Sequence, residues 1–170
     1  MGIKMNKAGI LRAKLPSKIT FDDASKYKEG MTPTKIKIWS GSAIDAVQLE
    51  CGETSFEKHG GNGGGCKEYK IPEGKYIKKI CVVCGGFGGE SVLTGLTFYD
   101  QDGKLLAGKE GDGKTEELIA GDEECICALY GETVKAGGII VVSGIGIYTA
   151  KVPDLKDMFG ALGDIKGRFF

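Results

Sequence analysis

The chain has 170 residues, 23 Lys plus Arg and 23 Asp plus Glu, so its formal net charge is zero. This balance argues against nucleic acid or an acidic membrane surface as a partner, and the absence of a long apolar run excludes a membrane-spanning helix. Glycine is unusually frequent, at 29 residues against a usual share of roughly 7%. Because Ile, Val and Leu accompany the glycines, we predict one all-β domain with many tight turns.

Short runs of alternating or apolar residues predict strands along most of the chain. The expected strands lie within residues 35–50 (two strands around a turn at Ser40-Gly41-Ser42), 69–71, 76–84, 92–99, 104–107, 117–120, 125–130 and 139–148. Residues 52–65 and 85–89 are rich in glycine and are predicted to be loops. No long helical period is visible before residue 150.

Three segments of the chain resemble one another, which indicates an internal repeat. Each begins with an Ile-led strand of six residues that ends in glycine, and the strands start at residues 36, 80 and 126. A second strand follows in each segment, and its third position is Asp45, Thr94 or Ser143. Three repeats of about four short strands predict three sheets around a pseudo-threefold axis.

In their order and spacing, several of these motifs resemble the jacalin-related lectins. The matching pieces are ITFDD at 19–23, KIKIWSGSAIDAVQLE at 35–50, GGNGG at 60–64, PEGKYI at 72–77, LTGLTF at 93–98 and GIGIY at 144–148. The resemblance implies the β-prism I fold, in which three four-stranded Greek-key sheets have pseudo-threefold symmetry. It also implies a carbohydrate-binding module of the mannose or glucose type that is not an enzyme.

In that family, sugars bind between a glycine-rich loop and the Asp of a G-x-x-x-D segment. A carboxylate accepts charge-assisted hydrogen bonds from sugar hydroxyls, and glycine lets the backbone approach the ligand closely. The resemblance therefore implies one sugar site here, made of Gly41, Ser42, Asp45, Gly60 and Gly61. The family's principal site looks lost, because residues 12–18 lack a glycine loop and Ser143 replaces its Asp. Thr94 likewise replaces the Asp of the middle repeat.

Other motifs in the sequence carry weaker functional interpretations. Residues 108–115, GKEGDGKT, satisfy the pattern of a phosphate-binding loop, but no room follows for the helix that such a loop needs. Cys81 and Cys84 would point to opposite faces of one strand, so packed thiols are favoured over a zinc site. His59 is the sole histidine and has no visible catalytic partner. We expect no enzyme activity, no metal and no cofactor.

The predicted domain spans residues 17–150, between an N-terminal tail at 1–16 and a C-terminal tail at 151–170. Apolar residues recur at helical spacing in the C-terminal tail, at Leu155, Met158, Phe159, Leu162, Ile165 and Phe169. They could pack on their own domain or dock a protein partner, so the alternative function is a scaffolding subunit that has lost sugar binding. Formation of a homo-oligomer is left open. No signal peptide is visible, which favours the cytoplasm over secretion; in a secreted form, Cys51 and Cys66 are the expected disulfide pair.

Overall fold

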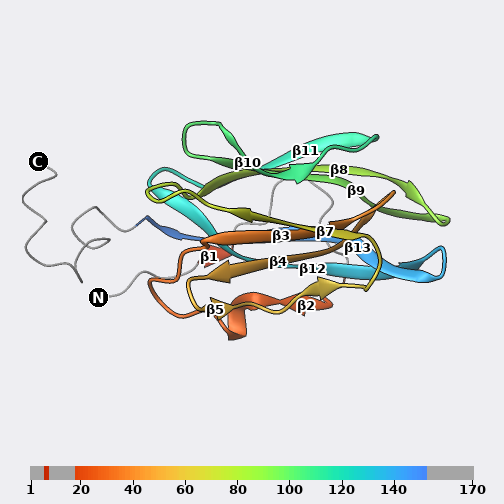
Figure 1. The fold of residues 1–170 in the computed structure, drawn as a ribbon, viewed down its shortest axis with the longest axis horizontal. Coiled ribbons are helices and arrows are strands. Elements are labelled where there is room, and N and C mark those ends of the chain that lie inside the picture. The colour runs from red at the N-terminus through yellow and green to blue at the C-terminus, as the bar shows by residue number, and fades with distance from the viewer. Residues whose placement is uncertain (1–5, 8–17, 153–170) are drawn as a thin grey trace, which may run out of the picture.

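The protein is built from three antiparallel β-sheets (Figure 1). The structure is a computed structural model that describes residues 6–7 and 18–152. Its strands are β1 (Asn6–Lys7), β2 (Phe21–Asp22), β3 (Lys35–Ser40), β4 (Ile44–Cys51), β5 (Thr54–Ser55), β6 (His59–Gly60), β7 (Gly65–Lys70), β8 (Ile77–Phe87), β9 (Glu90–Asp100), β10 (Leu105–Lys109), β11 (Lys114–Ile119), β12 (Glu124–Ala136) and β13 (Ile139–Lys151). Within the described residues, the only helical element is the single 3₁₀ turn η1 (Asp23–Ser25).

A central hairpin organises each sheet. In the second sheet, of order β10-β9-β8-β11, the chain leaves the β8–β9 hairpin, adds β10 beside β9 and crosses to add β11 beside β8. The first sheet repeats this path around β3 and β4, with β7 crossing to lie beside β3. The third sheet is built on β12 and β13, and its outer strands β1 and β2 come from the N-terminal part of the chain. This is the predicted threefold Greek-key prism.

The first sheet has five strands rather than the four predicted, because β5 and β6 both pair with β4. The chain between them turns inward at Phe56, whose side chain is 1% exposed and whose backbone N–H donates to Leu49 O at 3.1 Å. A large apolar side chain in the predicted polar loop therefore interrupts the edge strand, since burying the ring outweighs continuing the ladder.

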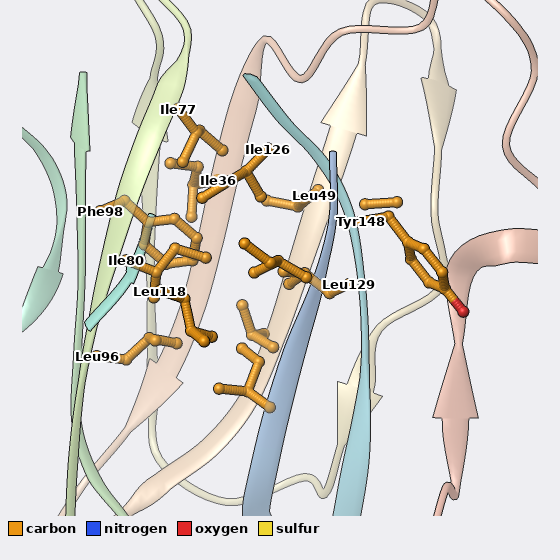
Figure 2. Packing of buried hydrophobic residues seen from close by; sticks show 14 of the residues in the cluster. Ile36, Leu49, Ile77, Ile80, Leu96, Phe98, Leu118, Ile126, Leu129 and Tyr148 are labelled. Carbon is orange, nitrogen blue, oxygen red and sulfur yellow. The ribbon is translucent and has the colours of Figure 1, made fainter. Parts of the chain in front are cut away.

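The core lies between the three sheets. The strand-leading residues Ile36, Ile80 and Ile126 are all fully buried, one from each sheet (Figure 2). Phe98 and Leu118, also at 0% exposure, fill the same cluster. The repeat read from the sequence therefore corresponds to the threefold construction of the core.

The predicted loop at residues 85–89 is instead strand, and only its last two residues form a turn. Gly88 and Gly89 have φ of +57° and +84°, and Gly137 and Gly138 at the tip of the β12–β13 hairpin have the same two values. These angles suit two-residue hairpin turns, which continue the strand twist. The two tips lie side by side, because a Cβ on Gly88 would lie 2.1 Å from the nitrogen of Gly137.

The remaining sequence-based interpretations have different outcomes. The phosphate-loop pattern at 108–115 connects β10 to β11, so the strand–loop–helix context that it requires is missing there. No helix in residues 18–152 is long and apolar enough to cross a membrane. The predicted apolar stripe from Leu155 onward lies outside the described residues. Part of the predicted N-terminal tail forms β1, which pairs with β13.

Candidate functional site

Asp45 occupies a β-bulge near the start of β4. In the β3–β4 ladder, Ser40 pairs with Ile44 and Trp39 pairs with Ala46, which leaves Asp45 as the extra residue. A bulge re-aims the side chain that it carries. Equivalent register shifts leave Thr94 unpaired between β8 and β9 and Ser143 unpaired between β12 and β13. The three positions aligned in the sequence thus share one backbone geometry.

The loop between β6 and β7 closes over Asp45. The backbone N–H of Gly61 donates to Asp45 O at 2.9 Å. A Cβ on Gly60 would lie 2.0 Å from Asp45 O, and on Gly63 or Gly64 it would lie 2.5 Å from one of the two carboxylate oxygens. These contacts require glycine, because any side chain would collide with Asp45. The structure therefore brings the predicted Asp and the predicted glycine loop together.

The Asp45 carboxylate is almost covered, with the residue 3% exposed. Burial raises the pKa of this carboxyl, while the backbone amide of Gly41 and the charges of Lys109 and Lys58 oppose the rise. The Lys109 Nζ also donates to Gly41 O and so connects the end of β10 to the turn before β4. Asp45 is therefore a partly desolvated hydrogen-bond acceptor that experiences the positive charges of Lys109 and Lys58.

A surface hollow lies beside the glycine loop that covers this carboxylate. It is lined by Gly60, Gly61, Asn62 and Gly63 from the loop and by Ile139 and Ile140 from the start of β13. The two isoleucines are 39% and 40% exposed. A Cβ on Gly63 would contact both Asp45 Oδ2, at 2.5 Å, and Ile139 Cδ1, at 3.6 Å, so the acidic and apolar groups face the same side of Gly63. The hollow combines polar backbone with an apolar wall.

Sequence reasoning identified only part of this site. Gly41 and Ser42 lie in the turn before the bulge, and Ser42 is exposed. Gly63 and Gly64 belong to the recognised glycine motif, but their contact with the carboxylate could not be read from spacing. Lys109 and the isoleucine pair come from the other two repeats, and nothing in the sequence links either of them to Asp45.

The other two bulge positions use their side chains within the fold. Thr94 Oγ1 donates to Asp112 O at 3.0 Å, which fastens the β10–β11 loop over the second bulge. Ser143 Oγ donates to Glu132 Oε1 at 2.9 Å. Neither position offers a carboxylate, so Asp45 is the only one of the three bulged residues that carries a charge.

The remaining ligating side chains do not assemble into a further site in the described part of the chain. Residues 18–152 contain no group of three or more His, Cys, Asp and Glu residues that could hold a metal ion. Cys51 and Cys66 are not joined: Cys51 is half-buried and Cys66 is exposed, each as a free thiol. Burial raises the pKa of the Cys51 thiol to about 12.

The three-sheet architecture and its bulged hairpins define the β-prism fold of the jacalin-related lectins. The sequence model of the jacalin-like lectin domain matches residues 17–148, so the chain belongs to this family. A comparison of the sequence with curated proteins found no match.

Solved structures with the same fold include lectins of different sugar specificity. A structure of artocarpin complexed with methyl-α-mannose has a TM-score of 0.63 and 15% identity, over 85% of this chain and 98% of that one. Wild-type Malaysian banana lectin has a TM-score of 0.61 and 19% identity, over 88% of this chain and 99% of that one. The lectin MPA, complexed with the T-antigen disaccharide, has a TM-score of 0.59 and 19% identity, over 78% of this chain and 99% of that one.

Proposed function

We propose that this chain is a carbohydrate-binding module of the mannose or glucose type that uses a single site at Asp45. The observation that carries the proposal is the bulged Asp45 carboxylate beneath the Gly60–Gly64 loop. A carboxylate accepts hydrogen bonds from adjacent sugar hydroxyls, and the loop supplies backbone groups at close range. Membership of the lectin family and the mannose complex of artocarpin support this assignment. A lectin role also fits the prediction that the chain is not an enzyme.

Asp45→Asn tests the site, with binding measured on a glycan array and by calorimetry with methyl α-mannoside. The amide keeps the shape of the side chain but loses a charged acceptor, so we expect affinity to fall at least tenfold. Asp112→Asn is the matched control, because it changes an exposed carboxylate in the equivalent loop of the second repeat. Unchanged binding by Asp45→Asn would exclude this site. Binding of galactosides in preference to mannosides would correct the sugar class.

A scaffolding subunit is the second candidate function. It is favoured by the hydrogen bonds that the Thr94 and Ser143 hydroxyls make within the fold. With these two hydroxyls engaged, at most one of the three equivalent positions remains for a sugar. We propose residues 151–170 as the docking segment beyond a domain at 17–150. This alternative predicts no glycan binding, together with co-purification of a partner that is lost when residues 153–170 are deleted. Retention of the partner by the shortened chain would count against it.

A further inference from the structure

The sole histidine lies immediately before the glycine loop, inside the protein. His59 is 5% exposed, and its Nε2 lies 2.5 Å from Oδ1 of Asp23, which is 2% exposed. The other oxygen of Asp23 accepts the backbone N–H of Leu129 in β12 at 3.1 Å. This buried pair therefore joins three parts of the chain that are distant in sequence: η1, β6 and β12.

A stacked ring completes the environment of this histidine. The Phe21 ring lies 4.2 Å from the His59 imidazole, with 12° between their planes. A Cβ on Gly131 would lie 2.5 Å from Phe21 Cζ, so the ring occupies space that only a glycine leaves open. The rotation and tilt of the imidazole are thus fixed by Asp23 on one side and by Phe21 on another.

We propose that the Asp23–His59 pair positions the candidate ligand loop without itself touching a ligand. His59 pairs with Val47 and Gly60 pairs with Ala46, so the imidazole anchors the two-residue strand from which the loop departs. The next contact along the chain is the bond from the Gly61 N–H to Asp45 O. A two-residue strand has little stability of its own, and the buried side-chain bond supplies the constraint that its short ladder lacks.

The first test measures the loop directly, by amide hydrogen exchange of Gly61 in the full chain. His59→Leu fills the space of the imidazole with an apolar side chain and removes the bond to Asp23. We expect Gly61 exchange to accelerate about tenfold in this variant. His59→Gln provides an amide N–H that can reach Asp23 and should restore most of the protection. Phe21→Leu removes the stacked ring but leaves Asp23 paired with His59, so we expect a smaller acceleration of Gly61 exchange. This variant also keeps the test valid should His59→Leu fail to fold.

Tyr148→Phe is the matched control. The Tyr148 hydroxyl donates to Asp22 Oδ1 at 2.7 Å, so this bond involves the residue next to Asp23 but neither member of the Asp23–His59 pair. We expect this variant to lose overall stability while Gly61 exchange stays at the wild-type value, once exchange through global unfolding is subtracted. Equal acceleration in Tyr148→Phe, or no acceleration in both His59→Leu and Phe21→Leu, would overturn the proposal.

The second test measures affinity, and only this part rests on the proposed function. We expect His59→Leu to bind methyl α-mannoside about tenfold more weakly, His59→Gln to recover, and Tyr148→Phe to bind normally. If the wild-type protein binds no sugar, the proposed function fails and the exchange data still decide whether the pair positions the loop. If the wild type binds but His59→Leu binds equally well, the positioning role is wrong and the sugar site stands.

Discussion

Gly63→Ala tests whether the glycine loop must lie against the Asp45 carboxylate. The added methyl carbon would lie 2.5 Å from Asp45 Oδ2, whereas carbon and oxygen atoms in contact lie roughly 3.3–3.6 Å apart, so a shift of about 1 Å is needed. Asp45 is itself buried and cannot turn freely into solvent. Overpacking of this kind costs about 1–3 kcal/mol of unfolding free energy, and the methyl group would also cover the acceptor. We therefore expect a lower urea midpoint and the loss of sugar binding.

Gly65→Ala is the control for this substitution. Gly65 ends the same loop, but no atom lies within 4 Å of the position that its Cβ would take, and its φ lies outside the left-handed region. Its change in unfolding free energy should stay within about 0.5 kcal/mol, with sugar affinity unchanged. Urea unfolding and calorimetry measure both quantities. If Gly63→Ala unfolded and bound like Gly65→Ala, the loop would not lie against Asp45 as described.

Three further predictions follow from burial and charge. Burial raises the folded-state pKa of Asp45, so the folded protein loses stability as pH rises through that value and the carboxyl becomes charged. Asp45→Asn cannot acquire this charge. Urea unfolding at pH 7 should therefore show Asp45→Asn to be more stable than wild type, with a smaller difference near pH 4. Phe98→Ala should cost about 3–5 kcal/mol in the same assay, since this ring is fully buried. In a thiol-reagent titration of native protein, exposed Cys66 should react first and buried Cys127, whose pKa burial raises, only on unfolding. A stability loss in Asp45→Asn, a near-neutral Phe98→Ala, or fast labelling of Cys127 would contradict the respective argument.

The sequence predicted the sheets well because their signals are local and repeated. Ile36, Ile80 and Ile126 begin apolar runs whose repeat is visible in the sequence itself. Turn signals failed where glycine served a different purpose. Gly85 was assigned to a loop, yet it lies in β8, where the carbonyl of Asp112 would be 2.7 Å from its Cβ. Local sequence does not distinguish a glycine that makes room for a neighbouring segment of the same chain from a glycine that forms a turn.

The site was less predictable for a related reason. Asp45 and the glycine loop both match motifs of the lectin family, so the resemblance alone was enough to combine them into one candidate site. The other contributors reach the site only after folding: Lys109 from the end of β10, Ile139 from a hairpin tip, and Asp23 through His59. Each of these contacts joins residues more than 30 positions apart, and their sequence neighbourhoods contain no matching signal.

The three bulged side chains differ in what they bind within the fold. A bulge re-aims the side chain that it carries, and that side chain can either bond to a neighbouring part of the fold or remain available as an acceptor. Thr94 binds its loop through the carbonyl of Asp112, and Ser143 binds Glu132. At Asp45 the loop is instead attached through backbone atoms, from the Gly61 N–H to Asp45 O, and His59 anchors its start. Under the proposed function the two residues would have separate roles: His59 would position the loop, and Asp45 would accept the sugar hydroxyls.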